Sequence, residues 1–567
     1  MNALLVAGIA VLFLWVGYVF YSRKVSDWLG LDPERTTPAH SMNDGVDYVP
    51  AKHWIILFGH HFSSIAGAAP IIGPVIACLL WGWLPAIIWI AVGGVLFGAV
   101  HDFSSLTLSV RHEGRSVADL TESVLGRGAQ IVFSLFVFLA LILIVAVFAA
   151  TAGKTLASTP QVVVPTFGLI LVAIFVGFLM YRTKVPLVAS SIIGLGLLFG
   201  LMAIGYYVPV ELPIDNPEGW WNAARCWTII LLIYGLVASV TPVHVLLQPR
   251  DYLSAGVLLV GMGAGFLGLA IVQPSVKAPA VVSFTATKGW LWPMLFVTIA
   301  CGAISGFHSL VASGTTSKQL PRMQDARPIG YGAMIAESAL AVLAVVAVTA
   351  GLYWKKVPGG VEGYVYQELM KGNNWILTFG KGYGELTKPL FLTLGSMVGI
   401  IMLNTFVMTT LDSATRITRY VCTELFGDSL NIKPLKNRYI ATLLVGLLAG
   451  GLALTEWQSI WPIFGSANQL VASLVLITVS AYLISRGRSF LFTVIPAALM
   501  LVTTMGALVF KILQFRGILP GEDKSMLLTV ISAILIVLGF FVVYKGVMTM
   551  KKALKKDAAD ETNSATA

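Results

Sequence analysis

The sequence has 567 residues, of which 57% are hydrophobic and only 11% are charged, and its formal net charge is +10. A soluble domain carries about 25% charged residues, so this composition excludes a soluble protein and indicates a membrane protein. The basic residues lie in short loops between apolar stretches and do not cluster on one segment, so the charge does not indicate nucleic-acid binding.

Taken in chain order, the apolar stretches predict an all-α protein with about 15 membrane-spanning helices and no sizeable soluble domain. We expect the spans at 3–21, 54–80, 83–110, 130–152, 162–181, 186–209, 226–247, 254–274, 290–316, 331–354, 387–414, 437–455, 458–484, 489–511 and 526–546. Basic loops alternate with acidic or aromatic ones, and basic loops are typical of the cytoplasmic side. The alternation predicts an N-terminus outside and a C-terminus in the cytoplasm.

The second span is interrupted by polar and helix-breaking residues. The stretch from Phe58 to Pro74 holds two histidines, two serines, three glycines and two prolines. Proline removes a backbone donor and glycine adds conformational freedom, so we do not expect a continuous helix. Unwound backbone at membrane depth is tolerated only where it is buried in protein or lines a watery cavity. We therefore expect substrate or ion binding at Gly59, His60, His61, Ser63, Ser64 and Gly67.

The ninth span has a similar interruption. His308 precedes Lys318 by ten residues, which places it about 15 Å from the cytoplasmic edge. The second and ninth spans are seven spans apart and so run in opposite directions, and such paired interrupted helices are typical of inverted-repeat transporters. Close packing through small residues explains the glycines but not three histidines near the midplane. The binding residues expected here are His308, Ser309, Ser313, Gly314, Thr315 and Thr316.

Three acidic residues inside the spans are candidates for proton coupling or gating, because charge at membrane depth is costly. Glu337 is either a proton carrier or a hydrogen-bonded structural acid. Asp102 lies in the inner half of its span. For Asp412 we favour a salt bridge to Arg416, four residues later. The Asn468–Gln469 pair either lines the pathway or joins helices.

Seven segments carry a family resemblance. They are FGHHFSSIAGAAPIIGP at 58–74, GAVHDF at 98–103, LLQPRDYL at 246–253, CGAISGFHSLVASGTTSKQL at 301–320, DARPIGYGAMIAES at 325–338, TTLDSATR at 409–416 and WPIFGSANQL at 461–470. In these segments the chain resembles the carbon starvation protein A (CstA) family of bacterial transporters. The resemblance implies a multi-pass protein of the bacterial inner membrane that takes up peptides, or pyruvate as the alternative, together with a proton.

The resemblance also implies a fold similar to the LeuT-type arrangement of two inverted five-helix repeats. On that basis 1–50 forms an N-terminal helix and a cytoplasmic loop, 51–485 the transporter core, 486–550 accessory helices and 551–567 a cytoplasmic tail. Residues 58–74 then resemble the first, broken core helix. The sixth is either 301–318, with Thr409–Ser413 in the eighth, or 226–247, with Gly314–Ser317 in the eighth.

The expected mechanism is alternating access around a midplane site. Half-helix N-termini suit a substrate carboxylate, and the three histidines can pair with it or take a coupling proton. Peptides and pyruvate share that carboxylate, so this chemistry does not separate them. We expect no cofactor, no metal and no enzymatic activity. The alternatives are an intramembrane metal enzyme that uses His60 and His61 with His101 and Asp102, and a channel or sensor of the same substrate.

Overall fold

The computed structural model describes residues 1–214, 219–243, 246–358, 362–371, 374–454, 457–521 and 524–565. Within these residues the fold is helical, with one antiparallel hairpin of β1 (Thr285–Ala286) and β2 (Gly289–Trp290). Thirteen of the described helices are long and apolar enough to cross a membrane. The two further predicted spans are α20 (Arg438–Ala453), which is shorter, and 290–316, which is broken.

The second span is broken, as its prolines and glycines predict. Helix α4 (Trp54–Ala66) ends before Gly67, whose φ of +25° and ψ of −157° turn the chain, and α5 (Ala69–Leu80) begins two residues later. Pro70 in the first turn of α5 has no N–H to offer the carbonyl of Ala66, and its ring would clash with that carbonyl in a continuous helix.

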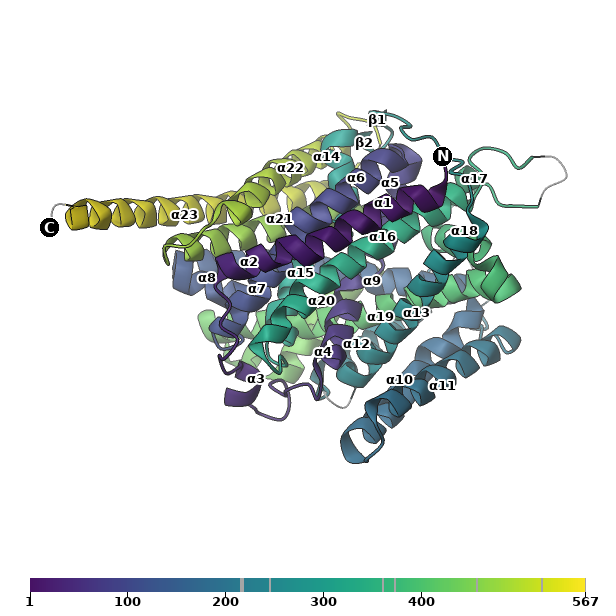
Figure 1. Ribbon diagram of the computed structural model, residues 1–567, viewed down its shortest axis with the longest axis horizontal. Helices are drawn as coiled ribbons and strands as arrows, with labels where there is room; N and C mark the ends of the chain where they lie inside the picture. Colours follow the sequence, from purple (N-terminus) through teal and green to yellow (C-terminus); the bar gives the residue numbers. More distant parts are fainter. Residues whose placement is uncertain are drawn as a thin grey trace.

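The ninth span is broken over a longer stretch. Helix α14 (Leu291–Thr298) is followed by seven non-α residues, and the helix resumes as α15 (Gly306–Val311) and the π-helix η4 (Ala312–Thr316). In Figure 1 the chain rises from α4 to α5 and descends from α14 to α15, so the two broken helices have opposite orientations.

Each half of the core has five membrane-spanning units in the same order, and the third unit is preceded by α8 in the first half and by α17 and α18 in the second. The first half comprises α4–α5, α6 (Trp83–Gly93) with η2 (Gly94–Gly98) and α7 (Ala99–Arg111), the short α8 (Val117–Leu125), α9 (Arg127–Ser158), α12 (Ala223–Val240) and α13 (Leu247–Val272). The second comprises α14–α15, η6 (Arg327–Tyr331) with α16 (Gly332–Ala350), the short α17 (Tyr366–Met370) and α18 (Trp375–Phe391), α19 (Gly395–Cys422), α20 and α21 (Trp457–Ile484). The core is therefore an inverted repeat with broken helices.

Helices α10 (Val163–Arg182) and α11 (Leu187–Tyr207) form a hairpin outside this core, at the lower right of Figure 1. They pack mainly on each other and on α13. This hairpin accounts for two of the seven spans that separate the broken helices in the sequence. The structure therefore has 301–318 in the sixth core helix and Thr409–Ser413 in the eighth. The other register does not occur, because α12 continues unbroken through most of 226–247.

Short helical turns connect the core helices, namely η3 (Pro160–Val162), η5 (Met323–Asp325), η7 (Leu392–Leu394), η8 (Thr423–Ser429) and η9 (Lys433–Lys436). Six further described helices lie outside the core. They are α1 (Ala3–Val16), η1 (Gly17–Tyr21), α2 (Ser22–Leu29), α3 (Pro38–Ser41), α22 (Leu491–Phe515) and α23 (Met526–Ala565). Helix α23 continues through most of the residues predicted as a tail, of which 566 and 567 lie outside the described part. The side chains of Trp461 and Pro462, in one of the family-like segments, also lie outside it.

Candidate functional site

The first cluster of buried polar residues joins α4, α12, α13 and α19. His60 Nδ1 lies 2.6 Å from Asp251 Oδ2, and Arg250 Nη2 donates to Asp251 Oδ1 at 2.7 Å. Arg250 Nη1 also contacts Asp412 Oδ2, which accepts a hydrogen bond of 2.7 Å from Tyr234. We call these five residues the His60 cluster. It holds one fixed positive charge and two carboxylates, away from water.

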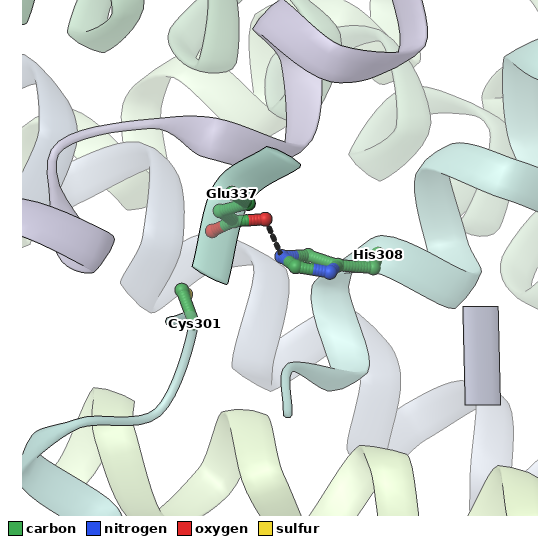
Figure 2. Close-up of side chains that lie close together, drawn as sticks. All are labelled: Cys301, His308 and Glu337. Atoms are coloured by element: carbon green, nitrogen blue, oxygen red, sulfur yellow. Dashed lines mark ion pairs between the residues drawn. The ribbon is translucent and has the colours of Figure 1, made fainter. Parts of the chain in front are cut away.

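The second cluster lies on α7, on the unwound segment before α15, on α15 and on α16. Asp102 receives contacts from two histidines, His101 Nδ1 and His308 Nδ1, each at 2.8 Å. His308 Nε2 lies 3.3 Å from Glu337 Oε2, and Cys301 lies on the other side of Glu337, as Figure 2 shows. All five are buried. We call them the His308 cluster.

Polar contacts near the first break join α4 to η4 and α19 in the second half of the core. His61 Nδ1 lies 2.8 Å from Thr316 Oγ1, and Ser64 Oγ lies 2.9 Å from Ser413 Oγ. The hydroxyls of Thr409 and Thr410 on α19 donate to the carbonyls of Ser63 and Ser64 at 2.7 and 3.2 Å. These two carbonyls are left over at the C-terminus of α4, so α19 satisfies the end of the broken helix.

Several predicted binding residues have structural contacts of their own. Hydroxyls at four positions donate to a carbonyl three or four residues earlier, namely Ser63, Ser309, Ser313 and Thr315. A Cβ on Gly59 would lie 3.1 Å from the backbone of Tyr252, and one on Gly314 would lie 3.1 Å from Ile417. These two glycines therefore permit close helix packing, whereas Gly67 forms the break itself.

The predicted salt bridge between Asp412 and Arg416 is wrong. Asp412 pairs with Arg250 across the helix interface, while Arg416 Nη1 contacts Asp47 Oδ1 at 3.0 Å. An exposed i,i+4 pair contributes only about 0.3–0.5 kcal/mol. The tertiary contacts of Asp412 with Arg250 and of Arg416 with Asp47 therefore determine the pairing, and the sequence spacing does not.

Asp47 lies in the loop before α4, outside the spans. Burial alone raises the pKa of Asp47, but the hydrogen bond from Tyr420 and the positive charges of Arg416, Arg419 and Lys318 together hold this pKa below its ordinary value. The loop is thus tied to the end of α19 by a carboxylate that stays ionised at neutral pH.

The N-terminus of α15 already has a polar partner. The backbone N–H of Phe307 donates to Asn468 Oδ1 at 2.7 Å, and Asn468 Nδ2 donates to Ser305 Oγ at 2.9 Å. In this conformation, the donor that we expect to face a substrate carboxylate is capped by α21. Asn468 therefore joins helices here, which is one of its two predicted roles.

Four residues of the two clusters are not evident as site residues from the sequence, namely Arg250, Asp251, Tyr234 and Cys301. Arg250 lies in the first turn of α13 with 1% of its side chain exposed. The available signal was an adjacent Arg–Asp pair at the start of an apolar stretch, where a buried charge needs a partner. The partner, Asp412, is distant in the sequence and so could not be identified from spacing.

Comparison with known families places the chain among carbon starvation proteins. The family model described as "Carbon starvation protein CstA" matches residues 2–367 and 367–507. The peptide transporter CstA of Campylobacter jejuni is 33% identical over 569 residues, which cover 89% of this chain and 80% of that protein. The pyruvate/proton symporter BtsT of Escherichia coli is 33% identical over 604 residues, covering 92% and 83%. The peptide transporter CstA of Bacillus subtilis is 31% identical, covering 96% and 97%.

Among solved structures, a crystal structure of the Eremococcus coleocola manganese transporter superposes with a TM-score of 0.50. It is 11% identical, and the match covers 90% of this chain and 99% of that one. At this identity the likeness shows the fold alone. It agrees with the inverted repeat described above and with a LeuT-type core.

Proposed function

The chain belongs to the carbon starvation protein CstA family and is a multi-pass membrane transporter, and from this premise we propose that it takes up short peptides together with a proton. Uptake occurs by alternating access around the break between α4 and α5. Proton-coupled uptake of pyruvate is the second candidate, because a relative of equal identity is named a pyruvate/proton symporter. The basic ends of α7, α19 and η4 face the cytoplasm of a bacterial inner membrane, with the N-terminus outside.

The observation that carries the coupling is the charge of the His60 cluster. Arg250 balances only one of the two carboxylates Asp251 and Asp412, and all three are buried. An uncompensated buried charge is costly. A proton on His60, which touches Asp251, would make the cluster neutral. The titratable neighbours of His60 are His61 on its own helix, the Arg250–Asp251 pair on α13, and Tyr234 and Asp412 across the cluster.

This balance links the proton to helix motion. His60 lies on the broken helix, whereas its partners lie on α13 and α19. When α4 moves relative to those two helices, His60 parts from Asp251. Parting an ion pair inside the protein is unfavourable, so proton release accompanies the movement to the inward-facing state.

The same balance favours a peptide over a small anion. A zwitterionic peptide adds no net charge to a cluster that one proton has neutralised. A pyruvate anion adds one negative charge, which needs a further positive partner in a region of low dielectric constant. In this proposal His61 and Ser64, on α4 before the break, contact the carboxylate and the amine of the substrate.

Uptake into proteoliposomes tests the proposal. Labelled dipeptides and labelled pyruvate are supplied with and without a pH gradient, and with sodium replaced by choline. We expect dipeptide accumulation that requires the pH gradient and not sodium. Accumulation that ignores the gradient would exclude proton coupling, and no uptake of either compound would exclude both substrates.

A variant pair locates the coupling. His60→Gln keeps a hydrogen-bonding side chain but cannot become charged, so it should lose gradient-driven accumulation while counterflow exchange continues. The matched control is His112→Gln, since the His112 ring lies at one end of α7, outside the His60 cluster, and contacts the Leu108 carbonyl and a tyrosine ring. If His60→Gln still accumulates substrate with the gradient, the proton is carried elsewhere.

A further inference from the structure

Three side chains of different chemistry converge beside the second break. Cys301 lies on the unwound segment after α14, His308 on α15 and Glu337 on α16. One donor atom of each, the cysteine sulfur, an imidazole nitrogen and a carboxylate oxygen, lies within 4.8 Å of the other two. Figure 2 shows the three side chains pointing toward one another from three separate segments.

Among the described residues, the imidazole and carboxylate atoms that face this point lack hydrogen-bond partners, whereas the sulfur of Cys301 contacts Ser305 and Asn468. Within the part of the chain that the structure describes, both carboxylate oxygens of Glu337 and the Nε2 atom of His308 are buried without a hydrogen-bond partner, although the two groups lie only 3.3 Å apart. Their side chains are fully buried, and Cys301 is 3% exposed. Leaving a buried polar atom unpaired costs about 1–3 kcal/mol. A neutral hydrogen-bonded triad would satisfy these atoms, and this arrangement does not.

The surrounding contacts resemble those that support metal ligands. Asp102 contacts His308 Nδ1 at 2.8 Å, which leaves Nε2 free to coordinate and fixes the orientation of the ring. His101 in turn contacts the other oxygen of Asp102 at 2.8 Å. The amide of Asn468 donates to the sulfur of Cys301 at 3.5 Å. The contacts from Asp102 and from the Asn468 amide stabilise the forms of His308 and Cys301 that bind a cation, whereas the Cys301 thiol must give up the proton that it donates to Ser305 at 3.4 Å.

We propose that Cys301, His308 and Glu337 form a binding site for a borderline-soft divalent cation of the Zn²⁺ type. Sulfur, imidazole nitrogen and carboxylate oxygen are the three donors that Zn²⁺ takes in proteins, and three protein ligands leave a fourth position open. Hard ions such as Mg²⁺ prefer oxygen ligands, and a thiolate disfavours them.

The geometry requires only a small adjustment. Tetrahedral zinc with bonds of about 2.0–2.3 Å places neighbouring ligand atoms roughly 3.3–3.8 Å apart. The His308–Glu337 distance of 3.3 Å already meets this. The widest pair, at no more than 4.8 Å, needs to close by about 1 Å, which side-chain rotation of cysteine and glutamate can supply.

A bound ion would join the second break to α16. Cys301 and His308 lie on opposite sides of the turn into α15, so the ion would fix the angle between the unwound segment and that helix. This consequence rests on the proposed alternating access. Zn²⁺ bound at this site should therefore slow uptake, whereas Zn²⁺ binding does not depend on the transport proposal.

Metal binding by the full-length protein, purified in detergent without a histidine tag, tests the site. Because the side chains are buried, the protein is prepared from cells grown with added Zn²⁺ and is also incubated with Co²⁺. We expect one zinc per chain by elemental analysis. With Co²⁺ we expect a thiolate-to-metal charge-transfer band. Cys301→Ser should abolish that band, and Asp102→Asn should weaken Zn²⁺ affinity by about 10–100-fold.

Two further variants make the result decisive. Glu337→Gln keeps the shape of the side chain and should lose zinc while eluting as a monodisperse folded protein. Cys78→Ser is the matched control, since Cys78 is a buried free thiol on α5 outside the cluster, and it should retain zinc. A wild-type protein without zinc and without the cobalt band overturns the proposal, and so does zinc retained equally by Cys301→Ser and Glu337→Gln. Zinc bound with uptake unchanged overturns only the effect on transport.

Discussion

Replacing Arg250 by methionine tests whether charge balance holds the His60 cluster together. The side chain of Arg250 is 1% exposed, and those of Asp251 and Asp412 are fully buried. At an effective dielectric constant of about 20, opposite charges at the Arg250–Asp251 distance of 2.7 Å attract by about 6 kcal/mol. Desolvation offsets several kcal/mol of this attraction. Removing one partner of a buried pair costs about 3–5 kcal/mol, and we expect a loss of that size.

A second substitution in the same chain shows whether Arg250→Met loses stability through charge imbalance or through lost packing. Arg250→Met leaves two carboxylates, of which a protonated His60 balances one. Adding Asp412→Asn removes the other, so the double variant should be more stable than Arg250→Met alone, with a coupling of about 0.5–3 kcal/mol. Packing lost with the arginine side chain would be the same in both variants and would not be recovered.

Thermal unfolding in detergent, followed by size-exclusion fluorescence at one fixed pH, measures both differences. The expected order of melting temperature is wild type, then the double variant, then Arg250→Met. An Arg250→Met protein as stable as the wild type would refute the charge argument. A double variant no more stable than the single one would refute it as well.

Three further outcomes follow from single contacts. The fold holds the pKa of Asp47 below its ordinary value, so its carboxylate stabilises the protein above about pH 4. This stabilisation is lost as the pH falls through the lowered pKa, and Asp47→Asn should remove that step from a plot of melting temperature against pH. Gly67→Ala should lower uptake and stability, because φ is +25° and a Cβ would lie 3.0 Å from a threonine hydroxyl. Gly196→Ala is the control and should leave melting temperature and uptake unchanged, because no described atom outside its own helix backbone lies within 4 Å of the added Cβ. Asn468→Ala leaves the N–H of Phe307 buried without its partner, so the melting temperature should fall by an amount equivalent to about 1–3 kcal/mol.

The sequence by itself determined the helical membrane fold and the position of its irregular segments. Runs of apolar residues long enough to span a bilayer need no tertiary information, because each helix satisfies its own backbone hydrogen bonds. The first break was predictable for a local reason, because Pro70 has no N–H for the carbonyl four residues earlier and Gly67 adopts a positive φ that other residues rarely take. The family could also be identified from the sequence, because its motifs are contiguous segments.

Only the tertiary structure decided which polar groups meet. Asp412 has Arg416 one turn away, yet it pairs with Arg250, 162 residues distant in the chain. Cys301 and Glu337 come together only because the chain unwinds before α15 and α16 packs beside it. The α10–α11 hairpin adds two spans between the broken helices, so the five-helix repeat is not apparent from the number of spans. Spacing along the chain does not show that this hairpin packs outside the core. A buried charge is stabilised by whichever partner the packing brings within hydrogen-bonding distance, and packing is a property of the whole fold.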